Sequence, residues 1–236
     1  ETQNLIVSLL DQATDLKKKR EEADEKMAIF APALFHQMFG DPAKNERGWS
    51  KEKLSDLCEI LNGYAFKSEK YVDSGTRVIR ITNVQKGFIV DNDPKFYPLN
   101  TTEPVQRYEL REGDLLVSLT GNVGRVGLLQ RDLLPAALNQ RVACVRLRSS
   151  NILMRYLFVL LNGSMFENEC INAASGVAQK NLSTTWLGNF QIPVPPIEKQ
   201  QRFVELIEYL YDLQEKQRAQ RMMLANAFDG MVQDLL

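Results

Sequence analysis

The start and the end of this 236-residue chain carry the same sequence pattern. The identical positions include Glu1 and Glu198, Gln3 and Gln200, Val7 and Val204, Leu9 and Leu206, Asp15-Leu16 and Asp212-Leu213, Lys19 and Lys216, and Ala28 and Ala225. Such a repeat indicates two copies of one structural unit. The fold must therefore place two equivalent segments at the ends of one intervening region.

Apolar residues recur in both segments in steps of three and four, which is the spacing of a coiled-coil seam. The first seam is Ile6, Leu10, Ala13, Met27, Ala31, Leu34 and Met38, and the second is Phe203, Ile207, Leu210, Leu224, Phe228, Met231 and Leu235. Both seams turn polar in the middle, at Lys17, Arg20 and Asp24 and at Gln214, Gln217 and Arg221. We expect two long α-helices that pack as an antiparallel coiled coil. The alternative is that both helices pack on a globular core.

Turn-forming residues mark the limits of these helices. Gly40-Asp41-Pro42 ends the first, and the stretch from Ile192 to Pro196 forms a rigid entry to the second. We therefore predict helices over residues 1–40 and 197–236 and one domain over residues 41–196.

The intervening region has the pattern of a mixed α/β (α+β) domain. Apolar runs over residues 78–81, 114–119 and 142–147 predict strands, and residues 152–162 predict a helix. Gly121, Gly124 and Gly127 follow the second of these runs. Their spacing matches no phosphate-binding loop, so we expect turns between short strands.

The charge is balanced overall but not locally. The chain has 29 Lys+Arg and 30 Asp+Glu, whereas residues 115–155 contain six arginines and one aspartate. Such a run is either a basic patch for a polyanionic partner or a solvated surface. No apolar run approaches the roughly 20 residues of a membrane helix, and no signal peptide opens the chain. The three cysteines form no CxxC motif, so we expect a cytoplasmic protein without disulfides or a zinc site.

Catalytic motifs are absent from the sequence. Asp93-Pro94-Lys95 has the DxK form that metal-dependent nucleases use, but three residues surrounded by turn formers carry little weight. His36, the one histidine, lies outside the predicted domain, which argues against a Ser-His-Asp or Cys-His site. The chain is therefore expected to bind a partner and to have neither a catalytic nor a metal site.

A series of short motifs in the chain resembles the DNA-specificity (S) subunits of type I restriction–modification systems. The motifs are Trp49, Lys53-Leu54-Ser55-Asp56-Leu57-Cys58-Glu59-Ile60, Gly63-Tyr64-Ala65-Phe66-Lys67 with Tyr71 and Gly75, Arg80-Ile81-Thr82-Asn83-Val84, Gly113-Asp114-Leu115-Leu116-Val117-Ser118 with Thr120-Gly121, Ala137-Leu138-Asn139-Gln140-Arg141-Val142, Gln179-Lys180-Asn181-Leu182-Ser183, and residues 192–200. Each motif is weak alone, but their order and spacing are specific, and together they cover nearly the whole chain.

The resemblance implies that DNA recognition and catalysis belong to different subunits. Such subunits alternate target-recognition domains, each reading half of a split DNA site, with helices that set the half-site spacing and dock methyltransferase subunits. Methylation, ATP use and cleavage, with S-adenosylmethionine, ATP and Mg²⁺, then belong to methyltransferase and restriction subunits, and this chain holds no cofactor. With one recognition domain instead of two, the chain is expected to be half a subunit. It is either a natural half that forms a homodimer through its helices or the C-terminal half of a longer chain. Its first residue, Glu1, fits an excised piece.

Double-stranded DNA is bound through cations that neutralise phosphates and through polar side chains that read base edges. The candidates in or beside the matched motifs are Lys67, Arg80, Asn83, Thr120, Asn122, Arg125, Gln140, Arg141, Lys180 and Asn181. The alternative for the amide side chains is that they tie loops together. The aromatic residues Tyr64, Phe66 and Tyr71 are expected in the core rather than as stacking platforms for bases.

Two other classes of function stay open. One is a protein-interaction module on a coiled-coil stalk without DNA specificity, and the other is an orphan DNA-modification enzyme. Binding of DNA against competitor separates the first from a specificity subunit, and binding of S-adenosylmethionine tests the second.

Overall fold

The computed structural model describes residues 30–174, 181–210, 212–213 and 216. The chain divides into two compact units, a unit of Glu1–Met38 with Gln201–Leu236, called the helical unit after its described residues, and a central unit of Phe39–Gln200. The polar centres of the predicted seams lie outside the described residues. The antiparallel coiled coil therefore stays a prediction.

The described parts of both end segments are helical, over residues 30–39 and from residue 197 to 210. Gly40 follows the first helix with φ 79°, the left-handed conformation that commonly ends a helix. Phe203 and Ile207 are buried, as their seam positions predict. In the first helix Phe35 is more deeply buried than Leu34 or Met38, and its ring packs edge-on against Phe203 with centroids 5.6 Å apart. The buried face is thus turned by one residue toward the larger aromatic side chain.

The central unit is built on a four-stranded antiparallel sheet in the order β2-β10-β7-β8. Its strands are β2 (Cys58–Asn62), β7 (Leu115–Ser118), β8 (Val126–Leu128) and β10 (Val142–Leu147). A second sheet has the order β6-β3-β9, with β3 (Thr76–Ile79), β6 (Phe96–Tyr97) and β9 (Ala136–Leu138). Strands β3 and β9 are parallel, and the other pairs of named strands are antiparallel.

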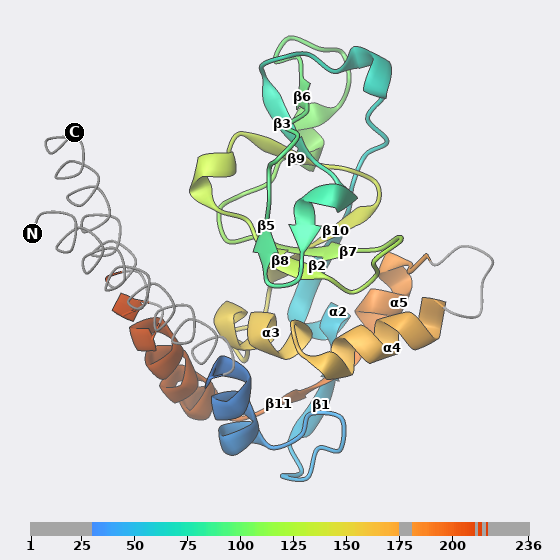
Figure 1. The fold of residues 1–236 in the computed structure, drawn as a ribbon. Coiled ribbons are helices and arrows are strands. Elements are labelled where there is room, and N and C mark those ends of the chain that lie inside the picture. Colours follow the sequence, from blue (N-terminus) through green and yellow to red (C-terminus); the bar gives the residue numbers. More distant parts are fainter. Residues whose placement is uncertain (1–29, 175–180, 211, 214–215, 217–236) are drawn as a thin grey trace, which may run out of the picture. The chain divides into compact units, whose positions relative to one another are not determined.

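Two further strand pairs complete the unit. Strands β4 (Val84–Gln85) and β5 (Phe88–Ile89) form a hairpin, and β1 (Ser50–Lys53) pairs with β11 (Gln191–Val194). The helices are α2 (Leu54–Leu57), α3 (Met154–Leu161), α4 (Ser164–Ala174) and α5 (Thr184–Asn189). Figure 1 shows α3, α4 and α5 on one side of the four-stranded sheet and strands β3, β6 and β9 on the other. No helix in the described part of the chain has both the length and the apolarity of a membrane crossing.

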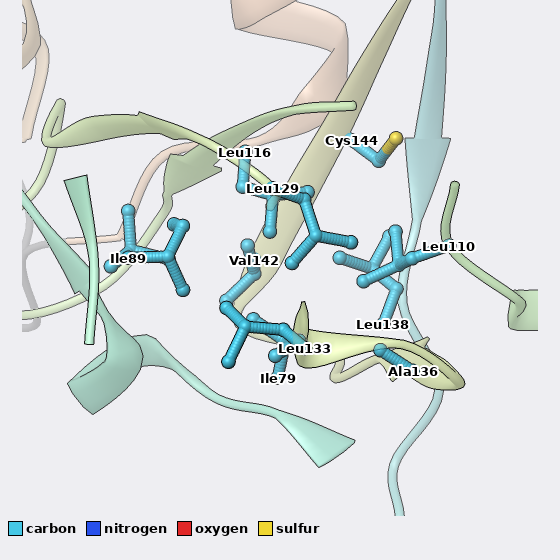
Figure 2. Close-up of a cluster of buried hydrophobic side chains, with 11 residues drawn as sticks. Ile79, Ile89, Leu110, Leu116, Leu129, Leu133, Ala136, Leu138, Val142 and Cys144 are labelled. Atoms are coloured by element: carbon cyan, nitrogen blue, oxygen red, sulfur yellow. The ribbon is translucent and has the colours of Figure 1, made fainter. Parts of the chain in front are cut away.

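The four-stranded sheet is covered on both faces, which explains its continuous apolar runs. Leu115 and Leu116 are both fully buried although they point to opposite faces, and the same holds for Ala143 and Cys144. One core cluster lies between this sheet and the second one (Figure 2), and it consists of Ile79, Val84, Ile89, Leu110, Leu116, Leu129, Leu133, Ala136, Leu138, Val142 and Cys144.

The smaller core cluster around Tyr97 holds the aromatic residues of the motif Gly63–Lys67 with Tyr71. Phe66 is buried there, and Tyr64 and Tyr71 pack against it. Their predicted role as core residues is confirmed.

The mixed α/β fold class is confirmed, and so are several of its elements. Strand β10 has the predicted bounds, and β7 and α3 lie inside the predicted runs. Strand β3 ends at Ile79 instead of residue 81, because the chain turns into a short 3-10 helix over Ile81–Asn83. Gly121 and Gly124 lie in the turn between β7 and β8 with φ of 69° and 78°, so the expected turn is confirmed for these two glycines, whereas Gly127 lies inside β8.

Candidate nucleic-acid interface

Backbone hydrogen bonds bring several predicted site residues together at one end of the four-stranded sheet. The N–H of Leu119 donates to the carbonyl of Arg141 over 3.0 Å, and the N–H of Leu182 donates to the carbonyl of Leu119 over 2.8 Å. The N–H of Gln140 donates to the carbonyl of Tyr64 over 2.9 Å. Segments far apart in the sequence therefore meet here. We call residues 119–125, 139–141 and 181–182 the loop cluster.

The turn between β7 and β8 is held from inside by the hydroxyl of Ser118. This fully buried group donates to the carbonyl of Asn122 over 2.5 Å and accepts from the N–H of Arg125 over 3.0 Å. Gly121 and Gly124 adopt positive φ, which a side chain would strain. The turn is therefore held in one conformation, while the Asn122 side chain stays exposed.

The turn is also supported from behind and from the side. A Cβ atom on Gly124 would lie 2.8 Å from Cβ and Sγ of Cys170, so only glycine lets helix α4 approach this closely. The half-exposed Thr120 forms an isolated antiparallel bridge with Asn181. Burial raises the pKa of the Cys170 thiol to about 12, which makes it a packing group and not a nucleophile at neutral pH.

Three exposed side chains in the loop cluster have no hydrogen bond or ion pair to any residue that the structure describes: Asn122, Gln140 and Arg141. Arg125 differs, because its Nη1 donates to Oε1 of Gln85 over 2.5 Å. The cluster thus offers one unpaired cation beside two unpaired amides. This combination suits a phosphate together with polar base edges.

Arg80 and Asn83 are occupied within their own loop. The Asn83 side chain is buried, accepts from the N–H of Arg80 over 2.8 Å and donates to the carbonyl of Val90 over 2.7 Å. Arg80 donates through Nη2 to the backbone carbonyl and to a carboxylate oxygen of Asp93. For Asn83 this geometry favours the loop-brace alternative that the sequence left open.

Lys67 and Lys180 are not placed in the loop cluster. Lys67 is exposed just before the 3-10 helix Ser68–Lys70. Lys180 lies outside the described residues.

The arginines at the two ends of β10, all within the run 115–155, have different surroundings. Arg146 makes two hydrogen bonds of 2.7 Å to the carboxylate of Asp114, and Arg148 lies 3.3 Å from a carboxylate oxygen of Glu59. Arg141 lies at the opposite end of β10, which at ~3.3 Å per residue is about 20 Å long. For Arg146 and Arg148 this geometry favours the alternative to a basic patch, because an extended strand separates them from Arg141 although all three are close in sequence.

Sequence reasoning missed Ser118 as a site residue, although a detectable signal was present. It is a polar residue inside the apolar run 115–119, and a buried hydroxyl needs hydrogen-bond partners. The Asp93-Pro94-Lys95 motif is an exposed ion pair, with Lys95 Nζ 2.6 Å from Asp93 Oδ1. That hydrogen bond, followed by the one from Arg80, lowers the pKa of Asp93. Within the described ranges no three His, Cys, Asp or Glu side chains are grouped as a metal site.

Known proteins share the sequence pattern of this chain. The type I restriction modification DNA specificity domain, as a family model, matches residues 46–221. The chain is 28% identical to the specificity subunit of the type I restriction enzyme MjaVIII of Methanocaldococcus jannaschii, over 95% of this chain and 54% of the relative. It is also 28% identical to the EcoAI specificity subunit of Escherichia coli, over 72% of this chain and 29% of that protein.

A solved structure shares the fold. The HsdS subunit of Thermoanaerobacter tengcongensis superposes with a TM-score of 0.58 at 21% identity, over 93% of this chain and 50% of that subunit. The chain thus spans about half the length, or less, of these three relatives. Because the family model covers most of the sequence, the chain belongs to the family of type I restriction modification DNA specificity domains.

Proposed function

We propose that this chain is a non-catalytic DNA-recognition component of a type I restriction–modification complex, and that its central unit reads one half of a bipartite site in double-stranded DNA. The observation that carries the proposal is the family match over residues 46–221, a range that contains the whole loop cluster. The exposed and unpaired side chains in that cluster support it.

The loop cluster divides the work of binding by chemistry. Arg141 neutralises a phosphate and contributes affinity that depends on salt. Asn122 and Gln140 carry the amide groups that pair with the N6 and N7 edge of adenine in the major groove. Because the Ser118 hydroxyl is bonded to Asn122 and Arg125 across the turn, the backbone of the turn loses little conformational entropy when Asn122 meets DNA.

The helical unit serves as spacer and as docking surface in this proposal. Its two helices pair antiparallel, set the distance between half-sites and contact methyltransferase subunits. Phe30 is 45% exposed and Leu213 is 37% exposed, so the described parts leave apolar surface uncovered. The partner on that surface is a second copy of the chain or the missing half of a longer subunit. The methyltransferase and restriction subunits bind and use S-adenosylmethionine, ATP and Mg²⁺.

The test is sequence-specific binding by the complex with its methyltransferase subunits, followed by mapping of the methylated sites. We expect one bipartite target that survives excess competitor DNA, and weaker, more salt-sensitive binding by the chain alone. A palindromic interrupted target supports the homodimer, and an asymmetric target supports half of a longer subunit. Equal binding to all sequences would contradict the proposal and leave the protein-interaction module. Turnover of S-adenosylmethionine by the isolated chain would instead reveal a modification enzyme.

A further inference from the structure

The two points where the chain enters and leaves the central unit lie side by side. Strands β1 and β11 pair antiparallel, with Ser50 opposite Val194 and Lys53 opposite Gln191. The first helix reaches β1 through residues 40–49, and β11 reaches the closing helix through Pro195 and Pro196. The contacts that hold the strand pair β1–β11 therefore determine how firmly both connections are oriented.

Gln200 is a buried polar residue at the exit. Its side chain is fully inaccessible, although glutamine is usually exposed. Its Oε1 accepts from the N–H of Leu153 over 3.0 Å, and its Nε2 donates to the carbonyls of Asn151 and Pro195 over 2.9 and 2.8 Å. Two of these bonds tie the first turn of the closing helix to the loop before α3, and the third ties it to the Pro195 segment that precedes the helix.

Trp49 holds the entrance in a similar way. Its indole Nε1 donates to the carbonyl of Phe39 over 2.9 Å, which satisfies a carbonyl at the end of the first helix. Its backbone N–H and carbonyl are both bonded by the side chain of Asn45, over 3.0 and 2.8 Å. Nζ of Lys199, from the exit, lies 5.1 Å from the centroid of the Trp49 ring. Entrance and exit are thus linked through one aromatic side chain.

Tyr156 of α3 completes the arrangement. Its fully buried ring packs edge-on against Phe39 with centroids 5.0 Å apart, and its hydroxyl donates to the carbonyl of Pro193 over 2.9 Å. We call Asn45, Trp49, Tyr156, Lys199 and Gln200 the junction clamp. It contacts both connections and contains no residue of the loop cluster.

We propose that the junction clamp determines how strictly the protein discriminates the spacing between its two DNA half-sites, and that Gln200 and Trp49 are its positioning residues. This inference rests on the proposed function. Adding one base pair to a spacer moves the second half-site by ~3.4 Å and rotates it by about 35°. A recognition unit on a loose connection would follow that rotation at little cost, whereas a clamped one cannot.

Hydrogen bonds suit this task better than apolar contact alone. Apolar burial stabilises close packing without preferring one orientation, whereas a hydrogen bond weakens steeply with angle. A buried amide with all three bonds satisfied therefore favours one direction for each connection. Loss of this amide should therefore widen the range of directions that each connection samples without unfolding the central unit.

The experiment measures binding of the complex with its methyltransferase subunits to sites whose spacer is lengthened or shortened by one base pair. For the parent chain we expect affinity to fall about tenfold per base pair, comparable to a mismatch. For Gln200→Ala and Trp49→Phe we expect a fall of less than about threefold, with unchanged preference within each half-site. Phe166→Leu is the control, because Phe166 is a buried core residue outside the clamp. It should keep the parent spacing preference.

Unchanged spacing discrimination in both clamp variants would overturn the inference while leaving DNA recognition intact. If the parent complex prefers no sequence at all, the proposed function fails, and the spacing role fails with it. Rigidity is tested without DNA by the distance distribution between spin labels at Lys67→Cys and Tyr209→Cys, two exposed positions, since the three native cysteines are buried. The distribution should broaden in Gln200→Ala but not in Phe166→Leu. Equal widths would refute the clamp itself.

Discussion

Both ends of strand β10 carry arginines, but the arginines at the two ends differ in whether they pair with acidic side chains. At one end Arg141 is exposed and has no side-chain partner among the described residues. At the other end Arg146 is bonded twice to Asp114, whose side chain is 5% exposed, and Arg148 is paired with Glu59. One end presents a cation to the surroundings, and the other neutralises its cations within the domain.

This difference shows that the number of arginines in a segment indicates its capacity to bind DNA only when arginines paired with acidic side chains of the same domain are left out. Arg146 also donates to the carbonyl of Glu109 over 3.0 Å, so its guanidinium links β10 to the segment 109–114 at two points. Its hydrogen bond with Asp114 is the main cause of its raised pKa. Arg146 is therefore expected to act in stability and Arg141 in binding.

The largest effect is expected from breaking the internal pair. Arg146→Met should lower the free energy of unfolding by about 3 kcal/mol, because it leaves the carboxylate of Asp114 buried without its ion-pair partner and with the N–H of Arg111 as its remaining hydrogen-bond donor. The double variant Arg146→Met with Asp114→Leu should recover much of that loss, since no unpaired charge then remains. Chemical denaturation measures both. A single variant as stable as the parent would refute the internal role.

The next effect concerns DNA. Arg141→Ala should weaken binding to all sequences several-fold and reduce the slope of log K against log salt by about one, as the loss of one phosphate contact requires. Its free energy of unfolding should change by less than about 0.5 kcal/mol, because the side chain is exposed and unpaired. Relaxed specificity at one base position would instead assign Arg141 to base reading. Unchanged affinity would remove it from the interface.

Arg148→Ala is the matched control at the other end of β10, and its effect should be small. The side chains of Arg148 and Glu59 are 62% and 41% exposed, and such ion pairs contribute about 0–1 kcal/mol. DNA affinity and its salt dependence should match those of the parent in the same titration. A loss as large as that of Arg141→Ala would mean that both ends face DNA.

The smallest expected effect is a change in pH dependence at a third ionic site. Hydrogen bonds from Lys70 and then from Tyr64 lower the pKa of Glu103 below its ordinary 4.5. A lowered pKa contributes stability above pH 4.5 that is lost as the pH falls through the lowered value. Glu103→Gln should therefore flatten the acid side of the stability curve, whereas Arg141→Ala should leave it unchanged. Parallel acid curves for Glu103→Gln and the parent would contradict this role.

Sequence alone was sufficient for features that depend on neighbours in the chain. The apolar run of β10, the glycine turn after β7 and the end of the first helix at Gly40 follow from local patterning and backbone conformation. The order of short motifs also indicated the family that the comparison over residues 46–221 identifies. Most of the long helical repeat lies outside the described residues, so its pairing stays a prediction.

Tertiary structure decided which polar residues are available. Asn83 and Asn122 both lie in or beside the family motifs. The Asn83 side chain is buried and hydrogen-bonded within its own loop, whereas the Asn122 side chain is exposed in the turn between β7 and β8. Arg141 and Arg146 are five residues apart, yet only Arg146 finds a carboxylate. The reason is that the partner of a polar group is chosen by strand pairing between distant segments: Val145 lies opposite Leu115, which brings Arg146 to Asp114. No pattern within the segment itself records which residue stands across the sheet.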